Sequence, residues 1–246
     1  MRSPAAYVTV LLMLILTSCA AGGGVCSYWD DVDVVVTESN YSAAEERFAR
    51  FAELLVQAPG DETDKALGVL FDRMKEDEVS YYVYADWIES AFHNYLSPCR
   101  NPIIFGKAAE LFERDRIIEQ ERIQELRTLA AQDMLNRPGD HCTVPDGAEA
   151  AGSALYLVLN LDCRTCLQSL EALSKAHPEA EHIALCFGYS PLPGLSGWKY
   201  LKPDGMGDIF DLEAAPFWFL TADDGSVSIP YCAEFQEPVF ASPEKI

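Results

Sequence analysis

The feature that most constrains the fold of this chain is a change in residue pattern near Gly139. Between Ser42 and about Leu135, apolar residues recur at steps of three and four, which is the spacing of amphipathic helices. After Gly139, short apolar runs alternate with an amphipathic segment and with turns rich in Gly and Pro. The sequence therefore predicts an α+β protein with two domains, an all-α domain followed by an α/β domain.

The first half predicts five helices without strand alternation. They cover residues 42–58, 63–77, 80–96, 102–115 and 121–135. Thr63 can cap the second helix, and Pro102 opens the fourth, where its missing N–H costs little. Aromatic residues of the third helix are expected in the core rather than on a ligand-stacking surface, because large apolar side chains are mostly buried. They are Tyr81, Tyr82, Tyr84, Trp87, Phe92 and Tyr95.

The second half predicts strands with one helix between the first two. Leu155–Leu161 is a nearly continuous apolar run, as expected of a strand covered on both faces. An amphipathic segment follows, and then His182–Tyr189 predicts the next strand. The loop-rich stretch after it predicts a short helix around Gly197–Leu201. Phe217–Leu220 and Ser226–Ile229 flank a DDG turn and predict a hairpin. This order is the skeleton of a thioredoxin-like fold.

The N-terminus reads as an export signal. An apolar run from Val8 to Leu16 is too short to span a membrane and is typical of a signal peptide. The ending LTSCA resembles a bacterial lipobox, in which Cys19 becomes the lipidated first residue; the alternative is an ordinary signal peptide cut near Ala20 or Ala21. The predicted division is a lipoprotein signal peptide at 1–19, a flexible tether at 20–40, a helical domain at 41–137 and a thioredoxin-like domain at 138–246.

The net charge and the predicted location limit the kinds of partner that the protein can bind. Both interpretations of the N-terminus take the mature chain out of the cytosol. We predict a location in the cell envelope, facing the periplasm or held on the outer membrane by a lipid on Cys19. Lys and Arg number 18 against 39 Asp and Glu, a net charge of −21 that repels phosphate backbones and argues against nucleic acid. Disulfides persist outside the cytosol. Cys186, in an apolar run, is expected as a buried strand residue, and Cys99 as a packing residue.

Cys163 and Cys166 form a CxxC pair between an apolar run and the start of the amphipathic segment. Disulfide exchange needs an exposed, stabilised thiolate and a second thiol that resolves the mixed disulfide. Cys163 at the positive end of a helix dipole and Cys166 one turn later meet both needs. Arg164 favours the thiolate at Cys163, whereas Asp162 opposes it.

Two other interpretations of the pair remain open. One is a static disulfide or a pair of buried thiols. The other is a zinc site that adds His141 and Cys142, although no second CxxC or His pair stands at the spacing of a structural zinc site. We therefore predict no metal and no cofactor.

The stretch LYLVLNLDCRTCLQSL, followed by Ala215-Pro216 and the hairpin FWFLTADDGSV, resembles periplasmic thioredoxin-like proteins related to TlpA and ResA. The stretch YLSPCRNPIIFGKAAELF resembles the helical domain of unknown function that precedes such a domain in lipoproteins of gut anaerobes, and LNRPGDHCTVPDG is similar to the linker between the two halves. The resemblance covers roughly residues 40–230. It implies that Pro216 is a cis-proline packed against the CxxC, and that Pro216 with Ala215 shapes a substrate-docking face.

The chain departs from that family's pattern in several places. Leu161-Asp162 stands where a Trp usually precedes the first cysteine, and Asn160 is the one polar residue where thioredoxins bury an acid. Arg-Thr separates the cysteines, which leaves the oxidising or reducing direction open. The C-terminal stretch has two prolines and little helical period, so a closing helix is expected to be short or missing.

Two functional classes follow. The first is an envelope thiol–disulfide oxidoreductase that acts on protein thiols or disulfides, with Cys163 as the attacking thiolate and Cys166 as the resolving thiol. The second is a non-catalytic, lipid-anchored interaction module in which the CxxC is structural. A large helical half and an acidic surface suit both classes.

Overall fold

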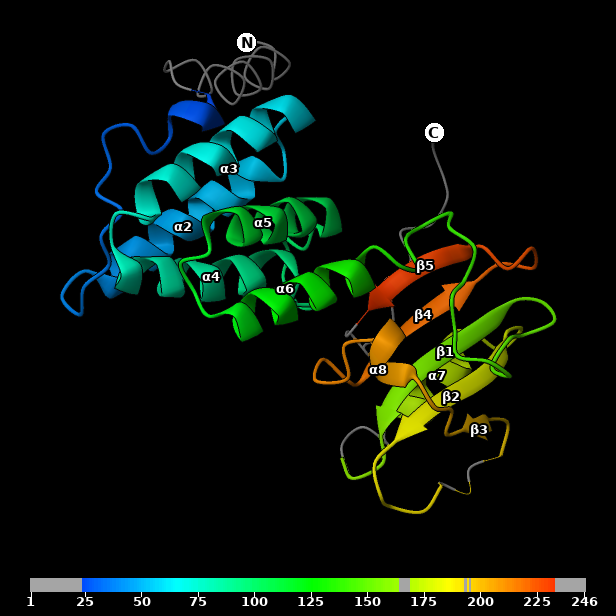
Figure 1. Cartoon of the computed structure of the whole chain (residues 1–246). Coiled ribbons are helices and arrows are strands. Elements are labelled where there is room, and N and C mark those ends of the chain that lie inside the picture. The colour runs from blue at the N-terminus through cyan, green and yellow to red at the C-terminus, as the bar shows by residue number, and fades with distance from the viewer. Residues whose placement is uncertain (1–23, 164–168, 193, 195, 233–246) are drawn as a thin grey trace, which may run out of the picture.

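A computed structural model describes residues 24–163, 169–192, 194 and 196–232 of the chain. Figure 1 shows a bundle of helices beside a sheet with its own helices, which confirms the predicted α+β arrangement. The predicted signal peptide with Cys19, the second cysteine Cys166 and the stretch after Cys232 lie outside the described residues. Within the described ranges, no helix combines the length and apolar character that a membrane crossing requires.

The helical part consists of a short 3₁₀ turn and five α-helices. These are η1 Val25–Ser27, α2 Tyr41–Leu55, α3 Gly60–Met74, α4 Glu78–Phe92, α5 Pro102–Asp115 and α6 Gln120–Asp133. Asn101 caps α5, because its side-chain oxygen accepts the N–H groups of Ile103 and Ile104. The predicted cap at Thr63 is wrong: α3 begins three residues earlier, and the Thr63 hydroxyl donates to the carbonyl of Pro59.

Aromatic side chains fill the core of the helical part. Tyr81, Tyr84 and Phe92 are fully buried there, as predicted. The structure differs from the predicted tether at 20–40, because Trp29 is also fully buried and Arg73 donates hydrogen bonds to three carbonyls of the surrounding segment. Burial of the Trp29 indole stabilises the folded state by more than the conformational entropy lost on ordering the segment costs. The segment therefore packs against the bundle.

The second part is a five-stranded sheet in the order β3-β2-β1-β4-β5. Its elements are β1 Ala154–Asn160, α7 Ser169–Ala176, β2 Glu181–Phe187, β3 Lys199–Leu201, α8 Met206–Ile209, β4 Phe217–Thr221 and β5 Val227–Cys232. Strands β1, β2 and β3 are parallel, and β4 runs antiparallel to β1 and β5. The helix predicted at 197–201 is wrong, since 199–201 pairs with β2 as a strand.

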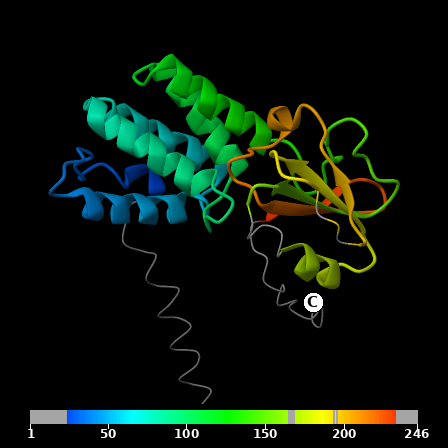
Figure 2. The same cartoon turned by 90° about the horizontal axis from the view of Figure 1, so that it is seen from below.

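The sheet is covered on both faces, which explains the continuous apolar run of β1. Tyr156 and Val158 face one core, whereas Leu155 and Leu157 face the other. Figure 2 shows the yellow-green α7 and the orange α8 on opposite faces of the sheet. The face that carries α8 is also the face that meets the helical part.

Aromatic and polar contacts join the two parts. The Tyr95 ring lies at right angles to Phe217, with 4.8 Å between centroids, and stacks on Tyr231 at 5.3 Å. Gln132 of α6 donates a 2.6 Å hydrogen bond to the carbonyl of Gly207 in α8. Asn136 donates a 2.8 Å hydrogen bond to the Tyr231 hydroxyl. The predicted core position of Tyr95 is therefore in the junction and not inside the bundle.

Candidate functional site

Strand β1 delivers Cys163 to one end of the sheet. Just after the strand, the side-chain oxygen of Asn160 accepts the N–H of Asp162 at 2.9 Å, and its carbonyl accepts the N–H of Cys163 at 3.2 Å. These bonds close a tight turn of the kind that Asn favours. Cys163 is half-buried against the core on the α7 face. Asn160 therefore shapes the turn that presents this cysteine.

Cys163 is disulfide-bonded in the structure. Cys166, its predicted partner, lies outside the described residues. Cys26, Cys99, Cys142 and Cys186 are free thiols. Burial raises the pKa of Cys186 to about 11, and Cys186 lies in β2 as predicted. Buried, protonated thiols such as that of Cys186 are poor nucleophiles.

The Ala215–Pro216 peptide is cis, as the resemblance implies. Pro216 immediately precedes Phe217, which pairs with Val158 close to the end of β1. The antiparallel register thus brings Pro216 to the same end of the sheet as the turn that carries Cys163. Ala215 and Pro216 are both half-exposed there. The two predicted halves of the site, which are more than fifty residues apart in sequence, share one edge of the fold.

Asp162 holds the turn to the loop after β2. Its carboxylate accepts hydrogen bonds from the N–H groups of Tyr189 and Ser190, both at 3.0 Å, and from the Ser190 hydroxyl at 2.6 Å. The hydrogen bond from Ser190 holds the pKa of Asp162 below its usual value. From the sequence, Asp162 is expected only to oppose a thiolate. In the structure the Asp162 carboxylate is instead hydrogen-bonded to this loop. These hydrogen bonds fix the position of the turn immediately before Cys163.

Gly188 makes this close approach possible, and its replacement tests it. A Cβ at Gly188 would lie 2.7 Å from an Asp162 carboxylate oxygen, and the backbone φ there is +97°. We expect Gly188→Ala to lower the free energy of unfolding by about 2–3 kcal/mol, from backbone strain together with the lost Asp162 contacts. Urea unfolding monitored by tryptophan fluorescence measures the change.

Gly197→Ala is the matched control for that measurement. Gly197 has φ +88° but no atom within 4 Å of an added Cβ. Its replacement isolates the backbone strain, which is about 1 kcal/mol. Equal losses in the two variants would show that the Asp162 contact contributes nothing.

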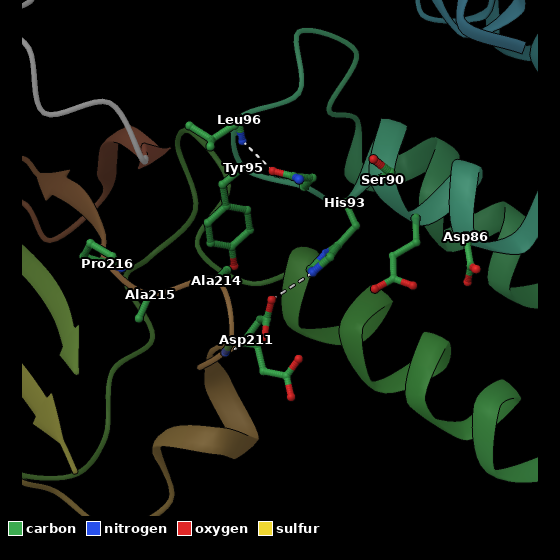
Figure 3. Close-up of a pocket in the computed structure, with 12 residues that line it drawn as sticks. Asp86, Ser90, His93, Tyr95, Leu96, Asp211, Ala214, Ala215 and Pro216 are labelled. Carbon is green, nitrogen blue, oxygen red and sulfur yellow. Dashed lines mark hydrogen bonds and ion pairs between the residues drawn. The ribbon is translucent and has the colours of Figure 1, made fainter. Parts of the chain in front are cut away.

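A cleft of about 640 Å³ opens between the two parts of the molecule beside Pro216. Figure 3 shows Asp86, Ser90 and His93 on the α4 side of the cleft and Ala215 and Pro216 on the sheet side, with Tyr95 and Asp211 between them. We call it the Pro216 cleft. Because its wall includes both predicted docking residues, the helical part contributes directly to the surface next to the candidate site.

His93 lines this cleft and is hydrogen-bonded to two carboxylates. Its side chain is 5% exposed; Nδ1 lies 2.8 Å from Asp133 of the helical part, and Nε2 lies 3.1 Å from Asp211 of the sheet part. Burial alone lowers the pKa of His93, but the hydrogen bonds to Asp133 and Asp211 outweigh it and raise the pKa to about 9. His93 is therefore protonated at neutral pH and ties the segment before Pro216 to the bundle.

The zinc hypothesis finds no ligand set in the described ranges. There, no three His, Cys, Asp or Glu side chains are arranged to hold a metal ion. The His141 ring bonds to the carbonyl of Cys142, which is next to it in sequence. Cys166, the remaining member of the imagined set, lies outside these ranges.

Comparison with known proteins gives one finding on the fold. No protein-family model and no curated protein matches the chain. Among solved structures, the chain is similar to a thioredoxin-like protein from Bacteroides caccae, with a TM-score of 0.64 and 18% sequence identity. The match covers 86% of this chain and 88% of the other, so it spans the helical part as well as the sheet. The chain therefore has an N-terminal helical part followed by a thioredoxin-like α/β fold.

Proposed function

We propose that this protein is a thiol–disulfide oxidoreductase of the cell envelope that acts on protein thiols or disulfides through Cys163 and Cys166. One observation carries the proposal: a disulfide-bonded Cys163 stands just after β1, at the same end of the sheet as the cis Ala215–Pro216 peptide that precedes β4. A cysteine pair is useful for exchange only where a second polypeptide can approach it, and Ala215 and Pro216 are half-exposed at this end of the sheet.

The reaction follows from the chemistry of the pair. In the reducing direction, the Cys163 thiolate attacks a substrate disulfide, a Cys163–substrate bond forms, and one substrate thiolate leaves. The Cys166 thiolate then attacks Cys163 Sγ, which releases the second substrate thiol and leaves the Cys163–Cys166 disulfide. In the oxidising direction the same steps run backwards. The described structure, with Cys163 in a disulfide, corresponds to the oxidised enzyme.

Pro216 and Ala215 form the substrate-docking face in this proposal. Both are half-exposed and both line the Pro216 cleft. Proline has no backbone N–H, so Pro216 leaves no unpaired donor at this end of the sheet. A substrate segment placed there lies across the sheet end to which β1 brings Cys163.

The non-catalytic alternative is favoured by one local feature. Asn160 stands where thioredoxins bury an acid, and its side chain is used in the turn before Cys163. An amide cannot carry a proton to or from Cys166. If no other group does so, the disulfide is structural and the protein is an interaction module.

Disulfide exchange with insulin in the presence of dithiothreitol separates the two functions. We expect the wild-type protein to accelerate insulin reduction and Cys163→Ala to lose this activity. Activity in neither protein, together with a Cys163 disulfide that resists dithiothreitol in the folded state, would favour the interaction module. The expected size of the effect is argued in the Discussion.

Membrane attachment through Cys19 is the second element of the proposal, and it is supported by the LTSCA sequence alone. In a bacterial host fed with radiolabelled palmitate, we expect the wild-type protein to carry label and to sediment with membranes. Cys19→Ala should lose both. Label on Cys19→Ala, or an unlabelled soluble wild type, would contradict the anchor.

A further inference from the structure

The Pro216 cleft continues into a second hollow along the end of α4. The second hollow has a volume of about 370 Å³ and lies between α2 and the segment after α4. Ser90, Asn94 and Leu96 line both hollows. Leu96 is 68% exposed and stands between them as a shared wall. We call the two together the α4 groove; it runs from Pro216 to Cys99 on the helical part.

The groove has apolar surface along its length. Phe48, Ala52 and Trp87 line the second hollow, and Ala214 with Pro216 line the first. Phe48, Ala52 and Trp87 are already buried, so the surface that a ligand can bury here is mainly that of the exposed Leu96. Burial of such apolar surface is favourable, at about 25 cal/mol per Å². A polypeptide segment, which has alternating side chains to fill both hollows, suits this shape better than a compact small molecule.

The charge of the groove is negative apart from His93, which is paired with Asp133 and Asp211. Neither hollow is lined by Lys or Arg. Arg122 pairs with Asp86 and Glu89 of the first hollow. Within the described ranges, Glu213 in the first hollow and Glu45 and Glu53 in the second take part in no ion pair. Both hollows therefore present unneutralised carboxylates beside apolar surface.

Tyr95 gives an independent indication of a ligand. It lines the Pro216 cleft, and Figure 3 shows its hydroxyl directed towards Ala214. The hydroxyl oxygen is buried and has no hydrogen-bond partner in the part of the chain that is described. A buried, unpaired hydroxyl costs about 1–3 kcal/mol. A carbonyl of a bound segment, reached by a small shift of the ring, would remove that cost.

We propose that the α4 groove docks a segment rich in Lys or Arg on the substrate polypeptide, next to the cysteine that exchanges with Cys163. The proposal rests on the proposed oxidoreductase function and names its substrate class. The sheet part supplies the chemistry, and the helical part selects the substrate by charge. Complementary charge raises the rate of encounter and suppresses wrong partners.

Two synthetic peptides test the proposal. Each carries the same central cysteine as a mixed disulfide with glutathione, flanked by three Lys in one peptide and three Glu in the other. We expect the reduced wild-type protein to exchange with the Lys peptide about tenfold faster at low salt, and the ratio to fall as salt rises. In Glu53→Lys/Glu213→Lys the ratio should drop at least about fivefold.

Glu110→Lys/Glu179→Lys is the matched control with two changes, because Glu110 and Glu179 are exposed and line neither hollow. It changes the net charge in the same direction but should keep the preference for the Lys peptide. Equal exchange of both peptides by the wild type, or an equal loss in the control, would overturn the proposal while leaving the oxidoreductase intact.

A binding measurement with a peptide that cannot exchange separates docking in the α4 groove from disulfide exchange at Cys163. A fluorescent Lys peptide with Ser in place of Cys should bind the wild type in an anisotropy titration, and binding should weaken in Glu53→Lys/Glu213→Lys. If that peptide binds but no disulfide peptide exchanges, the groove stands as a docking site and the proposed chemistry fails. If it does not bind, the groove proposal fails whatever the exchange rates are.

Discussion

Replacing Cys163 by alanine is expected to lower the rate of disulfide exchange on the order of a hundredfold or more, down to the rate of dithiothreitol alone. The size of the effect follows from the loss of the nucleophile. Cys26, a half-exposed free thiol of η1, has no second cysteine at CxxC spacing that could resolve a mixed disulfide. Cys186 and Cys99 are buried, and burial raises the pKa of Cys142 to about 12. Insulin reduction by the reduced protein measures the change.

The matched control is Cys186→Ala, which removes a thiol from the same sheet. Cys186 is 1% exposed in β2 and forms a hydrogen bond only to a carbonyl of its own strand. Exchange should persist in that variant although its stability falls. Residual exchange in Cys163→Ala at the wild-type rate would show that another group performs the reaction.

Replacing His93 by asparagine is expected to lower the free energy of unfolding by about 3–5 kcal/mol at pH 6.5, because it removes the cation that Asp133 and Asp211 share. The Asp133 side chain is fully buried and keeps only Arg100, at 2.6 Å. The Asp211 side chain is 13% exposed and loses its partner from the helical part. The change therefore weakens the junction between the two parts as well as the bundle.

His93 also makes the free energy of unfolding depend on pH, and its contribution decreases as the pH rises. The folded-state pKa of His93, about 9, lies above its ordinary value of 6.5. Its contribution is therefore fully present below pH 6.5 and is lost as pH rises through 9, for a total of about 3 kcal/mol. Other groups also titrate in this range, so the informative quantity is the difference between wild type and His93→Asn.

Urea unfolding at pH values between 6 and 10 measures that difference. We expect it to shrink as the pH rises. His141→Asn is the matched control, because His141 is exposed and its replacement makes the same chemical change at the surface. A difference between wild type and His93→Asn that stays constant from pH 6 to 10 would contradict a protonated His93 in the junction.

Much of the architecture could be predicted because it depends on local pattern. The continuous apolar run of β1 follows from burial on both faces, where Tyr156 and Leu157 meet different cores. The five helices were visible in their periodicity. The helix that the sequence predicts at 197–201 is instead strand β3 over Lys199–Leu201, because a strand of three residues is defined by its pairing with β2 and has no period of its own.

The features that could not be predicted depend on contacts distant in sequence. His93 and Asp211 are 118 positions apart, and only the docking of α8 against α6 brings them together. Trp29 lies in a segment with few helical signals, yet the bundle provides a pocket for its ring. A signal for Asp162 did exist: an acid next to the turn, with a Gly placed directly after the neighbouring strand.

The sequence predicts which residues belong to the site but not how they are arranged in space. The CxxC and Ala215-Pro216 could be named from the resemblance, whereas their meeting at one end of the sheet required the register of β1 and β4. The Pro216 cleft could not be anticipated at all. It exists only because the end of α4 and the segment before β4 come from different parts of the chain.

Trapping tests the central claim most directly, namely that Cys163 is a thiolate which substrate proteins can reach. In Cys166→Ala the resolving step is removed, so a mixed disulfide formed at Cys163 should persist. Expressed in the envelope of a bacterial host, this variant should yield covalent adducts that dithiothreitol releases, and Cys163→Ala/Cys166→Ala should yield none. Adducts that are absent from Cys166→Ala, or equally abundant in the double variant, would contradict the claim.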